Sequence, residues 1–428
     1  MYQEKFKIKK PFAISIVGLG KVGSAMLATY ADTGLKVYGV DSNTETLKSL
    51  MEGTPLVPEA NVGLLLKKNK KNIHLVDSIT KAIYNSNFTF VILPTPSGND
   101  DKFINSYLEE ACVEIAECLK SKNHFHTICI SSTVMPGTMS NFIKPLLEKL
   151  SGKIEGVDFG LAYSPEFIAL GSVVHNLKNP DISLVGCLSQ RTYTEVVKVK
   201  CRILKRYNLI KLTFEESEIV KLSINSYITM KISFANMIGE LADNTANSSK
   251  FNIMTAIGMD SRIGLKFLRP GLGYGGPCFP RDNKALSAFA RDLGIDSLLP
   301  KAVDSLNFRQ VDLTVKQILD LVDSKIGKIL FLGITYKENT GSIEESQIVK
   351  IGQVLEQKGF AVHFHDHNLT DGDFTKLNVF KRISLEEVII LDFDLIIFCQ
   401  RDERYKIVYE KLKLKNTKIL DVWGALND

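Results

Sequence analysis

The sequence lacks the patterns of a membrane protein, a disulfide-stabilised scaffold or a structural zinc site. No run approaches the roughly 20 apolar residues that a membrane-spanning helix needs. The seven cysteines are odd in number, scattered along the chain and never spaced as CxxC. Met1 to Lys10 are basic and polar and lack the apolar centre of a secretion signal. We therefore expect a short leader before the first strand, reduced cysteines and a cytoplasmic protein without a membrane partner.

Neither sign of charge predominates, since the formal net charge is only +5 over 428 residues. The densest basic run, Lys67-Lys-Asn-Lys-Lys71, has no aromatic partners, so we interpret it as a solvated turn rather than a nucleic-acid patch. An anionic small molecule remains compatible with this charge. The hydrophobic fraction of 45% excludes a largely disordered chain, and the length predicts two or three domains.

A glycine-rich turn separates a strand from a helix near the beginning of the chain. Phe12–Val17 is an apolar strand, and a helix follows from about Ser24, after which Lys36–Val40 forms a second strand that ends in Asp41. In such an order the first glycine permits the turn, the second lets a pyrophosphate reach backbone N–H groups, and the third allows close helix packing. Asp41 would accept hydrogen bonds from ribose hydroxyls and repel a 2′-phosphate, which favours NAD over NADP. The predicted NAD-binding turn residues are Gly18, Leu19, Gly20, Lys21, Val22 and Gly23.

Two later strands end in loops rich in hydroxyl groups. Phe88–Leu93 ends in Pro94-Thr95-Pro96, and the strand from Thr127 ends in Ser132-Thr133. Ligands of doubly wound sheets bind at the carboxyl ends of strands, so these loops are candidates for the nicotinamide end of the cofactor. The alternative is that they are turn-forming residues without ligand contacts.

A further strand ends in Ser164-Pro-Glu166, at a position where catalytic acids often occur. A solvated glutamate is the alternative interpretation. Ser183–Gly186 then supplies what we expect to be the last strand of the first domain.

One helical stretch without proline runs from about Phe214 to Ala246. Its apolar residues recur every three or four positions and give it a wide apolar surface, and at 1.5 Å per residue it spans roughly 45 Å. We expect this helix to connect two domains and to contribute to a homodimer interface. Lys221 and Asn225, four residues apart, share one face, and polar groups within an apolar stretch need a partner or a function.

The run from Arg269 to Asp282 contains four glycines and three prolines, so it must be a loop. Cys278 stands within it, followed by Arg281 and Asp282. A thiol on a glycine-rich loop, where a ligand can approach the backbone, suits a covalent nucleophile. An inert loop thiol is the alternative.

The last third of the chain returns to alternating strands and helices and predicts a smaller parallel sheet. The expected strands are Lys328–Gly333, Ala361–His365, Asp394–Cys399 and Lys418–Val422. Lys337 follows the first of these strands and suits a second anionic group.

Three histidines, His363, His365 and His367, alternate along one of these strands. Because no carboxylate except Asp366, which points the other way, lies at ligand spacing, we expect an exposed edge strand rather than a metal site.

The order and spacing of these motifs resemble the UDP-glucose/GDP-mannose dehydrogenase family over nearly the whole chain, from Ile14 to about Leu426. The motifs that carry the resemblance are Gly18-Leu-Gly-Lys-Val-Gly23, Pro94-Thr-Pro96, Ser131-Ser-Thr133, Ser164-Pro-Glu166-Phe-Ile, Lys221-Leu-Ser-Ile-Asn225, Arg262-Ile-Gly, Gly275-Gly-Pro-Cys278-Phe-Pro-Arg-Asp282 and Leu332-Gly-Ile-Thr-Tyr-Lys337.

The resemblance implies that the C6 alcohol of a nucleotide sugar is oxidised twice to a carboxylate with two NAD+ in succession. Cys278 would hold the aldehyde as a thiohemiacetal, which becomes a thioester that water hydrolyses. A nearby Lys221 ammonium would favour the thiolate, and Lys221 and Asn225 could donate to the oxyanion. Glu166 would be the base for the hydrolytic water, and Asp282 would orient Lys221 or that water.

The resemblance also implies substrate contacts. Arg262 would reach the substrate of the neighbouring subunit. The base, ribose and diphosphate would be held by Phe267, Arg269, Tyr336 and Lys337. The complete set of expected substrate-binding residues is Phe167, Ile168, Arg262, Phe267, Arg269, Gly275, Tyr336 and Lys337.

Two positions depart from the family pattern. Where the family usually has a glutamate and an arginine that face the cofactor, this chain has Leu170 and Glu344. Losing both together puts the cofactor geometry in question, while Cys278, Lys221 and Glu166 are retained.

We therefore expect an α/β protein with three parts: an N-terminal Rossmann-type NAD domain (1–205), a central helical dimerisation domain with the long helix and the cysteine loop (206–310), and a C-terminal Rossmann-like nucleotide-sugar domain (311–428). The expected activity converts UDP-glucose to UDP-glucuronate, with GDP-mannose next. The cysteine loop looks less like the acetamido-hexose branch, which usually has a histidine before the cysteine. Two alternatives are a sugar-nucleotide binding protein with impaired catalysis and a two-electron hydroxyacid-type dehydrogenase.

Overall fold

The structure, a computed structural model, describes residues 12–56, 59–322, 327–369, 377, 380–413, 417–424 and 426. The residues expected to form a leader, Met1 to Lys10, lie outside this range. The chain divides into two compact units, Met1–Lys221 and Leu222–Asp428, and each is described by itself.

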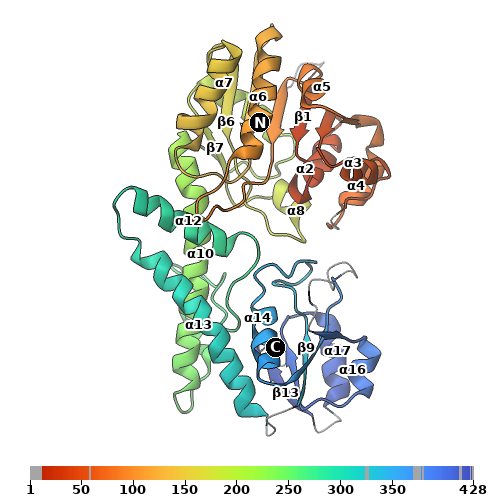
Figure 1. The fold of residues 1–428 in the computed structure, drawn as a ribbon, viewed down its shortest axis with the longest axis vertical. Coiled ribbons are helices and arrows are strands. Elements are labelled where there is room, and N and C mark those ends of the chain that lie inside the picture. Colours follow the sequence, from red (N-terminus) through yellow and green to blue (C-terminus); the bar gives the residue numbers. More distant parts are fainter. Residues whose placement is uncertain are drawn as a thin grey trace. The chain divides into compact units, whose positions relative to one another are not determined.

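The N-terminal unit, coloured from red to light green in Figure 1, is built on one eight-stranded sheet. The strand order is β3-β2-β1-β4-β5-β6-β7-β8. All neighbouring strands are parallel except β6 and β7. The central strands are buried along their whole length, as expected for a parallel sheet covered on both faces, whereas the edge strands β3 and β8 are partly exposed. The strands are β1 (Ala13–Val17), β2 (Lys36–Val40), β3 (Ile73–Val76), β4 (Phe88–Val91), β5 (His126–Ile130), β6 (Phe159–Tyr163), β7 (Ser183–Cys187) and β8 (Leu209–Leu212).

Helices cover both faces of this sheet and bury two separate apolar clusters. Helices α2, α4, α8 and α9 pack on one face, and α5, α6 and α7 pack on the other. The helical segments are α2 (Lys21–Ala31), α3 (Thr44–Met51), α4 (Val62–Lys68), η1 (Lys70–Asn72), α5 (Ile79–Tyr84), α6 (Ser106–Ser121), η2 (Met139–Ile143), α7 (Lys144–Ser151), α8 (Val173–Lys178) and α9 (Gln190–Lys200).

The predicted end of the first sheet was wrong. Ser183–Cys187 forms β7 as expected, but β8 follows it and pairs with it in parallel. β8 lies beyond residue 205, and the division between the units falls at Lys221, within the long helix α10 (Phe214–Asp243). The predicted domain boundaries at 205 and 310 stay predictions.

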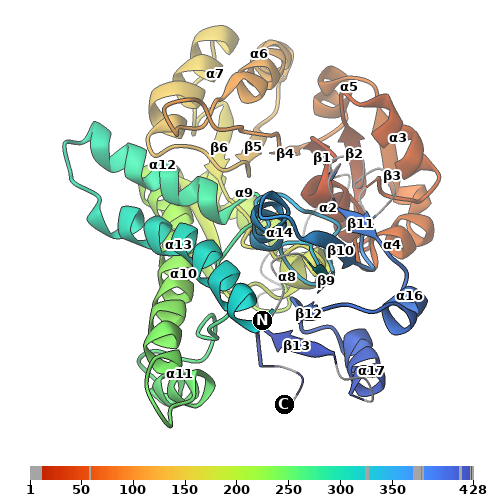
Figure 2. The ribbon, with the colours of Figure 1, turned by 60° about the horizontal axis from the view of Figure 1, so that its bottom comes forward.

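The C-terminal unit contains helices and a second sheet. Ser233 and Glu240 of α10 bond to Val303 and Arg309 of α13, so these helices lie side by side (Figure 2). The helices that follow α10 are α11 (Lys250–Met259), α12 (Phe279–Asp292), α13 (Leu298–Leu321), α14 (Gln347–Gln357), α16 (Leu385–Ile390) and α17 (Glu403–Leu412).

The second sheet has five parallel strands in the order β11-β10-β9-β12-β13. Helix α14 packs on one face and helices α16 and α17 on the other (Figure 2). The strands are β9 (Lys328–Leu332), β10 (Ala361–His365), β11 (Lys381–Arg382), β12 (Leu395–Phe398) and β13 (Lys418–Asp421).

The histidine strand is not an exposed edge, contrary to expectation. The short strand β11 pairs with β10 and covers its edge, so His363 and His365 are only 9% and 8% exposed. The pattern could not predict this, because β11 is two residues long and carries no apolar alternation.

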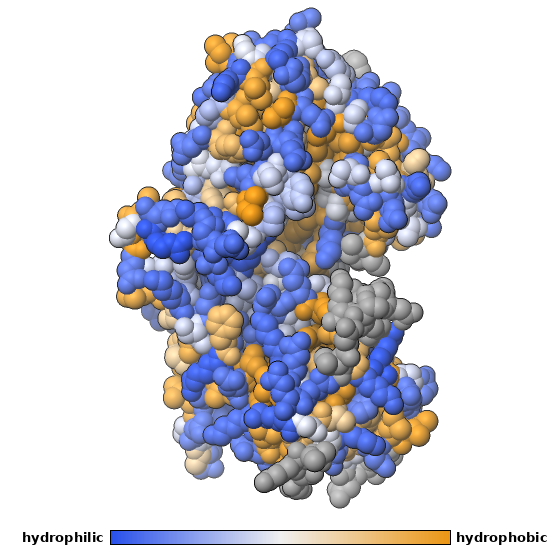
Figure 3. Space-filling view, in the orientation of Figure 1, coloured by the Kyte–Doolittle hydropathy of each residue, from blue (hydrophilic) through white to orange (hydrophobic). Residues whose placement is uncertain are grey.

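Hydrophilic and hydrophobic residues are interspersed on the face shown in Figure 3. Within the described residues, no helix combines the length and the apolarity that crossing a membrane requires.

Candidate active site

The glycine turn after β1 lies at the carboxyl edge of the first sheet, where the strand order reverses between β1 and β4. Gly18 has φ +90°, and a Cβ there would lie 2.2 Å from the carbonyl oxygen of Ile92. A Cβ on Gly23 would lie 1.9 Å from the carbonyl oxygen of Gly18. Both glycines are therefore required by the fold itself. Gly20 differs, because a Cβ there would meet no atom of the described residues within 4 Å.

The open side of Gly20 fits a bound pyrophosphate. Gly20 is the N-cap of α2, no side chain of the described part of the chain caps this helix end, and its first turn carries no acidic residue. Backbone N–H groups at such a helix end attract anions. The free space at Gly20 and the uncapped helix thus agree with the predicted NAD site, which Lys21, Val22 and Gly23 continue as the first turn of α2.

Asp41 follows β2 and binds the same turn. One carboxylate oxygen accepts a hydrogen bond from the Leu19 amide at 2.6 Å, and the other accepts one from the Asn43 amide at 2.8 Å. The carboxylate is thereby fixed beside the glycine turn, where its predicted ribose-binding role would need it.

The loops after β4 and β5 are joined by hydrogen bonds. The Thr95 hydroxyl donates to the carbonyl of Thr133 at 2.6 Å, and the Ser132 hydroxyl both donates to and accepts from the backbone of Leu93. Thr95 and Ser132 are buried, whereas Pro96 is exposed. The Ser132 hydroxyl therefore serves the junction of the two loops, and its predicted cofactor contact stays a prediction.

Glu166 follows β6 and is held at two points. Its carboxylate lies 3.0 Å from the Nζ of Lys200, and its backbone carbonyl accepts a hydrogen bond from the Nζ of Lys221 at 2.9 Å. The Lys221 ammonium also lies 4.7 Å from the centre of the Phe167 ring. The alternative interpretation of Glu166 as a solvated glutamate does not fit, since its side chain is only 11% exposed.

Lys200 was missed in the sequence, although a signal existed. It lies four residues after Val196 in α9, and both side chains are buried on the same face of the helix. A lysine within an apolar helix face needs a partner, which is the argument that singled out Lys221.

Glu218, three residues before Lys221, connects α10 to the loop after β5. Its carboxylate accepts hydrogen bonds from the amides of Gly137 at 2.6 Å and Met139 at 2.8 Å. Burial raises the pKa of Glu218 to about 7.

In the C-terminal unit, Cys278 is the exposed member of the seven cysteines, all of which the structure describes. It is the N-cap of α12, where the helix dipole favours a thiolate. The other thiols are inert by comparison: burial raises the pKa of Cys112 and Cys129 to about 12, and that of Cys187 and Cys201 to about 11.

Asn225 and Asp282 are brought together. The Asn225 amide donates to the Asp282 carboxylate at 2.6 Å, and Asp282 is 1% exposed. The next residue, Asn283, was missed although it adjoins the motif. Its carbonyl oxygen accepts from Ser226 at 2.6 Å and its amide donates to Asp304 at 2.9 Å, so it fixes the start of α12 against α10 and α13.

The cysteine loop packs against the loop after β9. A Cβ on Gly275 would lie 2.3 Å from the carbonyl oxygen of Glu345, and one on Gly276 would lie 2.5 Å from the Tyr336 ring. Gly276 also has φ +81°. The predicted substrate residues Gly275 and Tyr336 thus adjoin, which explains the glycines of this loop.

The other predicted substrate residues are spread over the C-terminal unit. Arg269 donates to the carbonyls of Trp423 and Gly424 at 2.6 and 2.9 Å. Arg262 is exposed and pairs with Asp260. Lys337 is exposed, and so is Phe267, whose φ of +64° is unusual for an aromatic residue.

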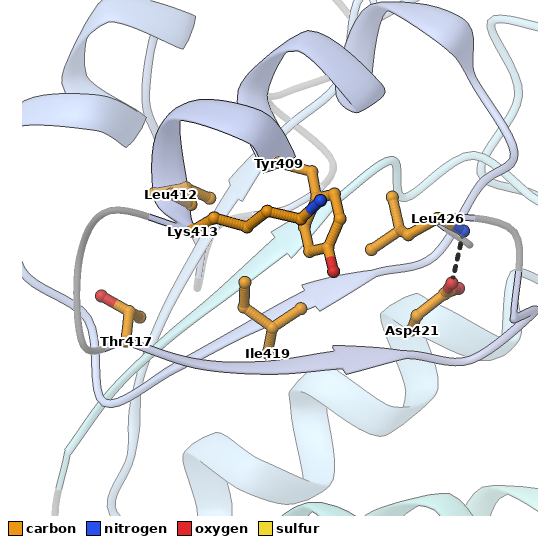
Figure 4. Close-up of a pocket in the computed structure, with 7 residues that line it drawn as sticks. All are labelled: Tyr409, Leu412, Lys413, Thr417, Ile419, Asp421 and Leu426. Atoms are coloured by element: carbon orange, nitrogen blue, oxygen red, sulfur yellow. Dashed lines mark hydrogen bonds between the residues drawn. The ribbon is translucent and has the colours of Figure 1, made fainter.

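Figure 4 shows a pocket between α17 and β13 that none of these residues lines; it is formed by Tyr409, Leu412, Lys413, Thr417, Ile419, Asp421 and Leu426. In the part of the chain that the structure describes, no group of three or more His, Cys, Asp or Glu side chains could hold a metal ion.

Comparison with known proteins agrees with this arrangement. Sequence models of the NAD binding domain, the central domain and the UDP binding domain of one family match residues 12–203, 215–309 and 330–428. The chain belongs to the UDP-glucose/GDP-mannose dehydrogenase family.

Individual members of this family are similar over most of the chain. The GDP-mannose 6-dehydrogenase of Pseudomonas aeruginosa is 30% identical over 361 residues, which cover 83% of this chain and 81% of the relative. The UDP-glucose 6-dehydrogenase of Haloferax volcanii is 29% identical over 361 residues, 84% of each chain. A UDP-glucose dehydrogenase structure from Pyrobaculum islandicum has a TM-score of 0.88 and 24% identity over 98% of this chain and 97% of that one, which shows the fold.

Membership of the dehydrogenase family confirms the predicted fold class and the NAD cofactor, and gives an NAD-dependent nucleotide-sugar dehydrogenase. Of the two departures from the family pattern, Leu170 packs against the apolar core of the N-terminal unit. Glu344 is exposed, and its carbonyl accepts from Gly276.

Proposed function

We propose that the protein oxidises the C6 alcohol of UDP-glucose to the carboxylate of UDP-glucuronate, in two steps that each consume one NAD+. The observation that carries the proposal is Cys278, the exposed cysteine among seven, placed at a helix N-terminus on a glycine loop. A two-electron alcohol dehydrogenase of the hydroxyacid type has no use for such a thiol. The three-domain assignment at residues 1–205, 206–310 and 311–428 is part of the same proposal.

Each protein residue has a chemical task in this proposal. When bound, NAD+ supplies the oxidant for both oxidations. Cys278 adds to the C6 aldehyde and holds it as a thiohemiacetal, and after the second oxidation as a thioester. Lys221 and Asn225, one helical turn apart on α10, donate to the oxyanion of each tetrahedral species. Glu166 takes a proton from the water that hydrolyses the thioester, and Asp282 orients Asn225.

GDP-mannose is a second candidate substrate, which the 30% identity to the Pseudomonas aeruginosa enzyme favours. UDP-N-acetylhexosamines and binding without turnover complete the set of alternatives. Purified protein with excess NAD+ and each nucleotide sugar in turn separates them. The preferred substrate should give two NADH per sugar consumed.

A Cys278→Ser variant should lose turnover, and Cys201→Ser, at a buried thiol, serves as the control. An unchanged rate in Cys278→Ser would refute covalent catalysis. One NADH per sugar would favour a two-electron dehydrogenase, and binding without NADH would favour the binding protein.

We also propose a homodimer that uses the apolar surface of α10. Tyr227 and Leu241 on this helix are 60% and 61% exposed, which is unusual for large apolar groups unless they meet a partner. A Leu241→Asp variant should sediment as a monomer. If the wild type itself sediments as a monomer, the dimer proposal is wrong.

A further inference from the structure

Glu166 forms a buried ion pair with Lys200 in the N-terminal unit. Lys200, the last residue of α9, is 2% exposed, and its Nζ lies 3.0 Å from a carboxylate oxygen of Glu166. The same Nζ donates to the Ser164 hydroxyl at 2.7 Å, and that hydroxyl donates to the carbonyl of Leu184 at 2.6 Å. The ammonium is therefore fixed by two side chains from one loop.

The other titratable groups around this pair are neutral or already bonded. Burial, and then the charge of Glu166, raise the pKa of Tyr30, whose buried hydroxyl has no hydrogen-bond partner among the described residues. Burial likewise raises the pKa of Cys129 and of Cys201. Lys221 binds the backbone carbonyl of Glu166, so Lys200 is the cation that meets the carboxylate.

This environment ties the position of the Glu166 carboxylate to Lys200. A carboxylate in a low-dielectric site takes up a proton unless a cation or hydrogen-bond donors stabilise its charged form. Leu170, on the same loop, packs against the apolar core and brings no second carboxylate. The Glu166 carboxylate and the buried Lys200 ammonium thus form an ion pair without a second carboxylate from this loop.

We propose that Lys200 is a positioning residue that holds the Glu166 carboxylate in the orientation needed for hydrolysis of the Cys278 thioester. The inference rests on the proposed function, in which Glu166 is the base. As the water oxygen bonds to the thioester carbonyl carbon, a proton passes to Glu166 and the C–S bond breaks. Cys278 leaves as the thiolate, the sugar carboxylic acid forms, and its proton passes to solvent to give the carboxylate, with no change in oxidation state.

The test compares Lys200→Met with Lys198→Met on the same helix. Lys198 is a matched control, because its Nζ pairs with Glu195 at 2.7 Å and its side chain is 30% exposed. Rapid mixing of enzyme, NAD+ and UDP-glucose or GDP-mannose follows NADH in the first turnover and in the steady state. Acid-quenched samples are weighed by mass spectrometry for a sugar acyl group on Cys278.

Lys200→Met should still release a burst of two NADH per active site and then turn over about ten-fold more slowly at pH 7, with the acyl adduct accumulating. Lys200→Arg should restore turnover and prevent accumulation of the adduct, and Lys198→Met should match the wild type.

Unchanged turnover of Lys200→Met without accumulation of the adduct would overturn the inference, and so would loss of the NADH burst. If Lys200→Met does not fold, the Lys200→Met/Glu166→Gln variant removes both charges and is compared with Glu166→Gln. Equal turnover in these two variants supports the inference, and a further loss in the double variant overturns it. A wild type that produces no NADH from any nucleotide sugar refutes the proposed function before any variant is made.

Discussion

The buried carboxylate of Glu218 should make the stability of the protein depend on pH in a way that one substitution removes. Glu218 is fully buried, accepts hydrogen bonds from two amides of the loop after β5, and has a pKa raised by burial to about 7. In Glu218→Gln the side chain keeps its size but no longer titrates. The variant also loses part of its hydrogen bonding, which changes stability by an amount that does not depend on pH.

The sign and size follow from proton linkage. Between the ordinary value of 4.5 and about 7, the folded protein holds a proton at Glu218 that the unfolded chain has released. The free energy of unfolding therefore falls as pH rises through this window. At 1.36 kcal/mol per pKa unit, the gap amounts to about 3 kcal/mol. The free energy of unfolding of the wild type minus that of Glu218→Gln should fall by about this amount from pH 4.5 to pH 8.

Urea unfolding followed by circular dichroism at half-unit pH steps measures this difference. Glu216→Gln is the control, because Glu216 is exposed on the same helix, accepts a hydrogen bond from the Thr213 amide at 2.7 Å, and should leave the shape of the wild-type curve unchanged. Parallel stability curves for the wild type and Glu218→Gln would refute the reasoning.

Three further substitutions test the site. Gly20→Ala should change the free energy of unfolding by no more than about 1 kcal/mol, because the added Cβ faces open space. It should weaken NAD binding by about 1.4 kcal/mol, or ten-fold, in calorimetry, because that space is where the pyrophosphate is expected. Unchanged affinity would contradict the pyrophosphate assignment. Gly276→Ala should lower the free energy of unfolding by about 2 kcal/mol or more, since φ is +81° and the Cβ meets Tyr336, and a neutral result in urea would contradict this. Asp282→Ala leaves the buried amide of Asn225 without its acceptor and should cost about 1 to 3 kcal/mol in the same assay, with a smaller loss expected once Asn225 is also alanine.

The parts of the fold that local chemistry dictates could be predicted from the sequence. The long helix begins at Phe214 as expected, because its apolar spacing persists without proline. The turn at Gly18 was predictable because a positive φ and a close backbone contact leave no alternative to glycine.

The features that could not be predicted from the sequence depend on contacts between distant segments. Strands β8 and β11 are short edge strands whose pairing, not their composition, defines them. The apolar face of α9 marks Lys200 as a residue that needs a partner, but no local pattern identifies that partner as Glu166, which lies on a distant loop. The exposed position of Cys278 among buried thiols is likewise a property of packing.

The uneven accessibility of the thiols has a practical use. A maleimide or iodoacetamide reagent, which needs an accessible thiolate, should attach to the folded wild-type protein at Cys278 alone. A fluorophore can therefore be placed on the cysteine loop without removing any native residue, and a nucleotide sugar added beforehand should protect that position from the dye.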